Sequence, residues 1–168
     1  MADDADQIVR LLSGSVVGGR GRASTLVHAH YDAVANFLGS APSPGSLNVV
    51  LRNPVLFRVE SATQFDKGKR RLWHATIGEL PIAIYRWRGT RAHVVEILAP
   101  MHLRTELMLN DGSNCNIRVQ DSVLYPISPA KQMMWRLMWQ GREDWYYRGE
   151  KYHARLRRIE WSLGLLQR

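Results

Sequence analysis

The sequence predicts a mainly β protein, a compact β-barrel with short helices that is followed by an α-helical extension. Two observations support this fold class. Several short β-prone segments alternate with turn signals over the first part of the chain, as in small barrels. After that, apolar residues recur at intervals of three and four, the spacing of an amphipathic helix. We therefore expect a barrel domain over residues 1–124 and a helical extension over residues 125–168, packed on the barrel or at a homodimer interface.

The N-terminal segment is expected to alternate between helix and strand. Residues 6–12 suit a short helix and residues 14–17 suit a strand, which leads into a flexible basic loop over residues 18–23. Residues 26–38 place apolar side chains at helical spacing. This helix is expected to end at Gly39, because glycine often follows the last turn of a helix.

The middle of the chain supplies most of the expected strands. Gly78 and Glu79 separate two β-prone segments and predict a hairpin. Residues 103–107 fit a short helix. The expected strands cover residues 46–51, 56–59, 71–77, 80–87, 94–98 and 116–119.

The extension is expected to form two helices, each with an apolar stripe. The first stripe comprises Met133, Met134, Leu137 and Met138 with Trp135 and Trp139, and the second comprises Tyr152, Leu156, Ile159, Leu163 and Leu166. Burying each such side chain is worth roughly 1.5–3 kcal/mol, so we expect both stripes to be buried. The basic side chains of Arg155, Arg157 and Arg158 then lie on the exposed side or near a phosphate site.

Composition narrows the class of protein. A single cysteine, Cys115, excludes an internal disulfide and a cysteine-built metal site, and it fits a reducing cytosol. The acidic first residues lack the pattern of a signal peptide, and no apolar run approaches the roughly 20 residues of a membrane span. We expect a cytoplasmic protein.

The charge favours anionic partners. The formal net charge is +8, and residues 129–168 alone hold nine Lys/Arg against four Asp/Glu. Nucleotides, nucleic acid and acidic membrane surfaces all satisfy such a charge. Charge alone therefore does not select one of these partners.

Ser46 and Asn48 form a candidate site for a hard cation. They follow Pro44-Gly45 at the entrance of a strand, where side chains two residues apart share a face. A hydroxyl and an amide oxygen side by side suit magnesium, which prefers oxygen ligands together with water and phosphate. Serine and asparagine also cap turns for purely structural reasons.

Glu96 is the exception in an otherwise apolar strand, residues 94–98. A carboxylate in such a run must face a polar cavity, a partner or solvent at a sheet edge. In a cavity it could orient or deprotonate an acceptor hydroxyl, which we hold as a hypothesis.

The order of these motifs resembles the CTP-dependent riboflavin kinases, which are six-stranded cradle-loop β-barrels. The shared features are a glycine-rich loop, a helix, Pro-Gly-Ser-Leu-Asn, then Glu-Ile-Leu-Ala-Pro followed by Leu-Arg and Asp-Gly. The resemblance covers roughly residues 13–120. It implies transfer of the γ-phosphate of CTP to riboflavin, giving FMN and CDP, with Mg²⁺.

The resemblance also implies roles for individual residues. Ser46 and Asn48 fall on the magnesium ligands, where the family usually has threonine and asparagine. Glu96 falls on a flavin contact, and Thr90 on another acceptor contact. The nucleotide contacts fall on Gly19, Arg20, Gly21, Arg22, Ala23, Ser24, Thr25, Met101, His102, Leu103 and Arg104.

Three alternatives remain open from the sequence. The acceptor could be another small hydroxyl compound, because residues 58–88 match no part of the family pattern. A barrel with a basic tail that interleaves tryptophan and tyrosine could instead bind nucleic acid, although such a protein has no need of the Ser46/Asn48 pair. The amphipathic tail could also bind a membrane surface. We favour the kinase.

Overall fold

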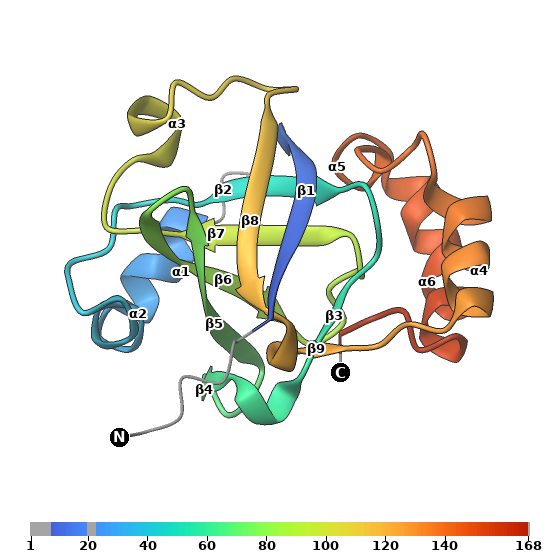
Figure 1. Ribbon diagram of the computed structural model, residues 1–168, viewed down its shortest axis with the longest axis horizontal. Coiled ribbons are helices and arrows are strands. Elements are labelled where there is room, and N and C mark those ends of the chain that lie inside the picture. Colours follow the sequence, from blue (N-terminus) through green and yellow to red (C-terminus); the bar gives the residue numbers. More distant parts are fainter. Residues whose placement is uncertain (1–7, 20–22, 168) are drawn as a thin grey trace.

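The computed structural model describes residues 8–19 and 23–167. Its strands and helices follow the chain in the order shown in Figure 1. The strands are β1 (Val9–Val17), β2 (Leu47–Leu51), β3 (Leu56–Phe57), β4 (Thr63–Phe65), β5 (Arg70–Ile77), β6 (Leu80–Trp87), β7 (Val94–Leu98), β8 (Asn114–Gln120) and β9 (Leu124–Tyr125). The helices are α1 (Ala23–Ala29), α2 (Tyr31–Leu38), α3 (Leu103–Glu106), α4 (Pro129–Trp139), α5 (Trp145–Arg148) and α6 (Glu150–Ser162), with 3-10 turns at Val59–Ser61 and Asp121–Val123.

Six antiparallel strands close into a barrel, which confirms the predicted fold class. The strand order is β5-β6-β7-β2-β1-β8, and β8 returns to β5 through the pairing of Thr76 with Arg118. Strand β4 extends the sheet beside β5, while β3 and β9 form a separate two-stranded ribbon. Alternate side chains point inward and fill the barrel, among them Leu47, Val49 and Ile97.

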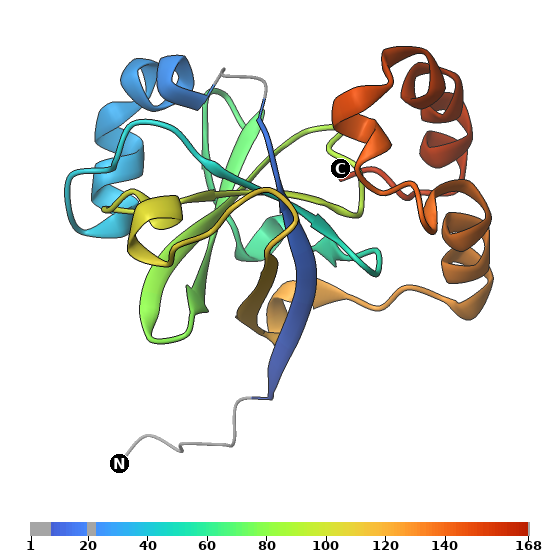
Figure 2. The ribbon, with the colours of Figure 1, turned by 90° about the horizontal axis from the view of Figure 1, so that it is seen from above.

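Two helical layers cover the outside of the barrel. Figures 1 and 2 show α1 and α2 on one side and α4 to α6 on the opposite side. Residues Leu26, Val27 and Val34 of the first layer pack on outward side chains of the barrel that include Leu98. The second layer packs Trp135, Met138 and Trp139 on Ala92 and Val94.

The outward face of β7 passes beneath both layers. Val94 lies under the C-terminal helices and Leu98 lies under α1 and α2. Glu96 is the outward residue between them, because side chains two apart share a face. The one charged residue of the strand therefore lies in the gap between the two helical layers.

Buried polar contacts attach the C-terminal segment to the barrel. Arg91 Nε lies 3.1 Å from Glu160 Oε2, and the side chains are only 2% and 1% exposed. Trp139 Nε1 also donates a hydrogen bond to Glu160, at 2.9 Å. After α6 the chain returns to the barrel, where the side chain of Gln167 bonds both the N–H and the C=O of Phe57. The extension is thus part of the barrel's packing.

Several sequence-based expectations are confirmed. The hairpin turns at Gly78-Glu79, between β5 and β6. The helical pattern over 26–38 ends at Gly39, which has the left-handed φ of 69°. That pattern is divided into two helices, however, with His30 between them.

The expected N-terminal helix is wrong for residues 9–12, which belong to β1; residues 6 and 7 lie outside the described part. Strand β1 pairs with β8 from Val9 and with β2 from Gly14 onward. The side chains of β1 alternate in burial because the strand forms part of the barrel wall. Its pairing with strands distant in sequence therefore outweighs the local preference for helix. Strands β4 and β9 and helix α5 were not expected.

The apolar stripes of the extension are narrower than expected. Met133 and Leu137 are 56% and 65% exposed, and Ile159 is 45% exposed. Helix α4 instead turns Trp135, Met138 and Trp139 inward, at the i, i+3, i+4 spacing of a single helix face. The arginines at 155, 157 and 158 are exposed, as expected. The homodimer stays a prediction.

In the described part of the chain, no helix has the length and apolar character that crossing a membrane requires.

Candidate active site

Three neighbouring strands place polar side chains in one row on the outside of the barrel. Asn48 of β2 pairs with Glu96 of β7, and Glu96 pairs with Tyr85 of β6. Cross-strand partners in an antiparallel sheet share a face, so the three side chains lie next to one another. We call Asn48, Glu96 and Tyr85 the polar row.

The two predicted magnesium ligands meet at one end of this row. The Ser46 hydroxyl donates a hydrogen bond to Glu96 Oε2 at 3.4 Å. Asn48 is buried within β2, and its Oδ1 accepts a hydrogen bond from the Tyr147 hydroxyl at 3.2 Å. Gly19 lies directly against this amide: a Cβ at that position would be 2.2 Å from Asn48 Nδ2. Only glycine permits the loop to approach so closely.

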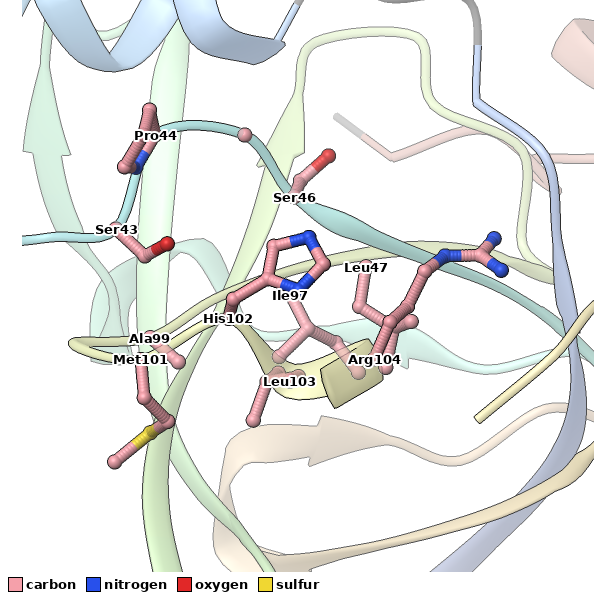
Figure 3. A pocket seen from close by; sticks show the side chains of 11 residues that line it. Ser43, Pro44, Ser46, Leu47, Ile97, Ala99, Met101, His102, Leu103 and Arg104 are labelled. Atoms are coloured by element: carbon pink, nitrogen blue, oxygen red, sulfur yellow. The ribbon is translucent and has the colours of Figure 1, made fainter. Parts of the chain in front are cut away.

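A small pocket, about 110 Å³ in volume, lies between the segment around Pro44-Gly45-Ser46 and residues 101–104. Figure 3 shows Ser43, Pro44 and Ser46, from the segment before β2, beside Met101, His102 and Arg104, from the segment after β7. They are brought together because β2 pairs with β7, so the segment before β2 lies next to the segment after β7.

The residues 101–104 contribute to this pocket in different ways. Leu103 is buried in the barrel core, so mainly its backbone is available to a ligand. His102 precedes α3, and its Nδ1 lies 2.7 Å from Thr105 Oγ1. Arg104 donates hydrogen bonds to the Val17 carbonyl at 2.9 Å and to Asp111 at 2.7 Å. Arg104 thereby links α3 to the end of β1, where the glycine-rich loop begins.

A larger cavity, about 890 Å³ in volume, lies on the other side of Ser46 and Glu96. Its walls come from α1, the β4–β5 turn, the end of β6, two members of the polar row (Glu96 and Tyr85) and α5. The lining includes Thr25, Leu26, His30, Asp66, Lys69, Arg70, Tyr85, Trp87, Arg88, Glu96 and Tyr146. The mixture of aromatic, cationic and acidic side chains suits a ring-bearing polar ligand.

The pKa of Glu96 depends on its position beside the small pocket and the larger cavity. Burial raises the pKa of its carboxyl to about 6, while the hydrogen bond from Ser46 and the charge of Arg70 oppose that rise. Tyr85 beside it has its pKa raised to about 12 by burial, against the effect of Arg70. Arg70 donates a hydrogen bond to the Tyr85 hydroxyl and another to Asp66, at 2.9 Å. Glu96 is therefore ionised at neutral pH yet basic enough to accept a proton.

The other predicted contacts have different outcomes. Arg20, Gly21 and Arg22 lie outside the described residues. Ala23, Ser24 and Thr25 open α1, and Ala23 and Thr25 line the larger cavity rather than the small pocket.

Thr90 lies elsewhere, in the turn that follows β6. It is only 1% exposed, and its hydroxyl bonds the backbone N–H and C=O of Trp87. Its side chain stabilises this turn, and its role as an acceptor contact stays a prediction.

Sequence reasoning missed the cationic and aromatic wall of the larger cavity. Asp66, Arg70 and Tyr85 belong to residues 58–88, where no family motif was recognised. Tyr146 and Tyr147 belong to the extension, which was assigned no role in the site. An available signal was the segment Tyr85-Arg86-Trp87, in which two aromatic side chains two residues apart share one face of β6.

The donor atoms near Glu96 fit magnesium. Within the described part of the chain, no group of three or more His, Cys, Asp or Glu could hold a metal ion. A cation here would depend on the Ser46 hydroxyl and the Asn48 amide oxygen, completed by phosphate and water. Hard oxygen donors of this kind match magnesium's preferences.

The fold and the site together define a barrel protein with two neighbouring hollows beside a half-buried acid, Glu96. Residues 16–119 match the family model CTP-dep_RFKase, described as "Domain of unknown function DUF120". The chain is also 31% identical over 127 residues to the riboflavin kinase of Saccharolobus solfataricus, an alignment that covers 64% of this chain and 73% of that protein. The chain belongs to the riboflavin kinase family of the CTP-dependent type.

Proposed function

We propose that the protein transfers the γ-phosphate of CTP to a ribityl hydroxyl of riboflavin, giving FMN and CDP. Family membership supports the reaction class. The observation that carries the proposal is the hydrogen bond between Ser46, which lines the small pocket, and Glu96, which lines the larger cavity. The bond lies at the boundary between the small pocket and the larger cavity. A phosphate donor in the pocket can therefore meet a hydroxyl acceptor in the cavity.

In this proposal the small pocket binds the nucleotide. The backbone around residues 43–46 and 101–104 offers hydrogen-bonding groups to the edge of a base. The narrow space favours a pyrimidine over the larger purine. Gly19 belongs to the loop that approaches the phosphates, and its contact with Asn48 brings that loop to the boundary.

The larger cavity binds riboflavin, and Glu96 acts as the general base. The hydroxyl oxygen of the acceptor attacks the γ-phosphorus, the bond from phosphorus to the β–γ bridging oxygen breaks, and the hydroxyl proton passes to Glu96. CDP leaves with the bridging oxygen. Trp87, which is half-buried, supplies aromatic surface for the flavin ring, and Tyr85 and Tyr146 also line the cavity.

Ser46 and Asn48 would hold Mg²⁺ in the proposed complex. When bound, the ion neutralises charge on the phosphate groups of the donor. Ser46 is placed to serve both sides of the boundary, because its hydroxyl also contacts Glu96.

The donor should be CTP in preference to ATP. Calorimetric titration with each nucleotide in the presence of Mg²⁺ measures this, and we expect the tighter dissociation constant for CTP. Titration with riboflavin, followed by flavin fluorescence, tests the larger cavity independently. Tighter binding of ATP would contradict the assignment of the small pocket.

Replacing Asn48 by alanine should lower turnover by at least about 100-fold at ordinary magnesium concentrations, because a ligand of the phosphate-neutralising cation is lost. The sequence placed Asn48 at the entrance of a strand, but its side chain is buried. Because the variant also loses the hydrogen bond from Tyr147, we expect the free energy of unfolding to fall by about 1 kcal/mol. Chemical denaturation and steady-state kinetics measure the two effects.

Asn116→Ala is the matched control for this variant. Asn116 is exposed on β8, and its side chain accepts a hydrogen bond from Ser13. We expect wild-type turnover from this control. Near-normal turnover of Asn48→Ala would show that the Ser46/Asn48 pair is only a turn element.

A further inference from the structure

The C-terminal extension reaches the proposed metal site although it lies beyond residues 16–119, the part that matches the family. Helix α5 supplies two consecutive side chains. Tyr146 lines the larger cavity, and the Tyr147 hydroxyl donates to Asn48 Oδ1 at 3.2 Å. Figure 1 shows α5 between α4 and α6 in the C-terminal helical layer.

The position of α5 is set by packing rather than by the helix itself. A single turn of helix is not stable alone, so its neighbours must hold it. The guanidinium of Arg91 lies 5.1 Å from the centroid of the Tyr146 ring, and Arg91 also pairs with Glu160 of α6. Tyr146 and Tyr147 contact each other edge to face, with ring centroids 4.8 Å apart. The Tyr147 hydroxyl is therefore tied to the barrel through buried contacts.

The Asn48 amide is confined on several sides by these neighbours. Its nitrogen faces Gly19, its oxygen faces Tyr147, and Glu96 is its cross-strand partner. An amide oxygen has two lone pairs, so one can accept from Tyr147 while the other remains for a cation. With the Tyr147 hydroxyl as donor, the amide oxygen lies on the α5 side and the amide nitrogen on the Gly19 side, so the Tyr147 contact fixes the orientation of the amide.

We propose that Tyr147 is a positioning residue that orients the Asn48 amide for the cation, so that the C-terminal extension completes the phosphate-transfer site. The inference rests on the proposed function, because it assigns Asn48 to the metal. It makes the extension a functional part of this protein and not only a structural addition.

The test is the affinity for Mn²⁺ in the presence of CDP, measured by electron paramagnetic resonance, which needs no turnover. Tyr147→Phe should weaken Mn²⁺ binding about 3- to 10-fold, the amount that one hydrogen bond supplies. Tyr125→Phe is the matched control, because the Tyr125 hydroxyl bonds Glu60 on an exposed part of the surface. It should bind Mn²⁺ as the wild type does.

A double-mutant cycle separates positioning from a general structural role. If Tyr147 acts through Asn48, Asn48→Ala with Tyr147→Phe should bind Mn²⁺ as weakly as Asn48→Ala alone, within about twofold. A further 3- to 10-fold loss in the double variant would overturn the inference. Wild-type affinity of Tyr147→Phe for Mn²⁺ would also overturn the inference, even if the thermal stability of this variant were lower.

The outcomes also separate this inference from the proposed reaction. A wild-type protein that makes FMN, with a Tyr147→Phe variant of unchanged Mn²⁺ affinity, refutes the inference alone. Weakened Mn²⁺ binding in a protein that makes no FMN refutes the acceptor and supports the inference. If the wild type binds no Mn²⁺ with CDP, both the metal assignment and the inference are wrong.

Discussion

Replacing Glu96 by glutamine should lower turnover by about 10²- to 10⁴-fold while making the folded protein more stable at pH 8. The loss of turnover follows from removal of the proposed general base. The gain in stability follows from burial, which raises the pKa of this carboxyl from 4.5 to about 6. Above pH 6 the carboxylate is ionised in the folded protein, where burial disfavours it, and also in the unfolded chain, where water solvates it.

The stability change has a definite pH dependence. Below about pH 4.5 the Glu96 carboxyl is protonated in both the folded and the unfolded state, so its ionisation does not lower the stability there. The loss of stability develops as the pH rises from 4.5 to 6 and is constant above that. Glutamine removes the cost, which corresponds to a gain of up to about 2 kcal/mol at pH 8. Urea unfolding of wild type and variant at pH 4 and pH 8 measures the difference.

Glu79→Gln is the control for this experiment. Glu79 lies in the exposed turn between β5 and β6, away from the site, so its replacement should leave turnover unchanged. Turnover near the wild-type value in Glu96→Gln would remove the carboxylate from the mechanism. A loss of stability at pH 8 would show that its ionised form is favoured by the fold.

Truncation after Val123 should destroy the cooperative fold of the barrel. It uncovers Ala92 and Val94, which pack beneath Trp135 and Trp139. It also leaves Arg91 without Glu160, and removing one partner of a buried ion pair costs about 3–5 kcal/mol. Since a whole domain has only about 5–15 kcal/mol of stability, we expect aggregation or loss of the unfolding transition.

A milder variant tests the same contact in the full chain. Glu160→Gln keeps the shape of the side chain but removes the charge that pairs with Arg91 at 3.1 Å, so it should lower the free energy of unfolding by less than the truncation does. Glu79→Gln again serves as the exposed control. A truncated protein that is monomeric and as stable as the full chain would contradict this account of the extension and would revive the nucleic-acid alternative.

Glu96, at the centre of the site, could be predicted from the sequence because it is the one charged residue in an otherwise apolar strand. Glu96 interrupts an apolar strand, and the structure places it in a cavity on β7, between β6 and β2 rather than at an edge. Ser46 and Asn48 lie two residues apart in the sequence, and strand alternation put them on one face with Glu96. The barrel itself followed from short strands and turn residues.

The remaining parts of the site depend on contacts between distant residues. Tyr147 contacts Asn48 across 99 positions of the chain, and no local pattern records that contact. Arg70 and Tyr85 meet because β5 and β6 pair in one particular register. The aromatic residues of the extension were predicted as a buried stripe, yet which of them face inward was decided by how α4 rests on Ala92 and Val94.

These placements also bear on the alternative of a nucleic-acid-binding tail. Trp135, Trp139 and Tyr146 are buried, so the greater part of their aromatic surface is engaged within the protein. Stacking on bases requires exposed rings. Trp145 and Trp161 are exposed, at 42% and 56%.

Product analysis with labelled donor tests the central proposal most directly. The purified protein is incubated with riboflavin, Mg²⁺ and CTP carrying a labelled γ-phosphate, and the products are separated by chromatography. We predict that the label appears in FMN, with one CDP formed for each FMN, and that Glu96→Gln forms far less of both. Unlabelled riboflavin with no CDP formed, or label transferred from ATP but not from CTP, would contradict the proposed reaction.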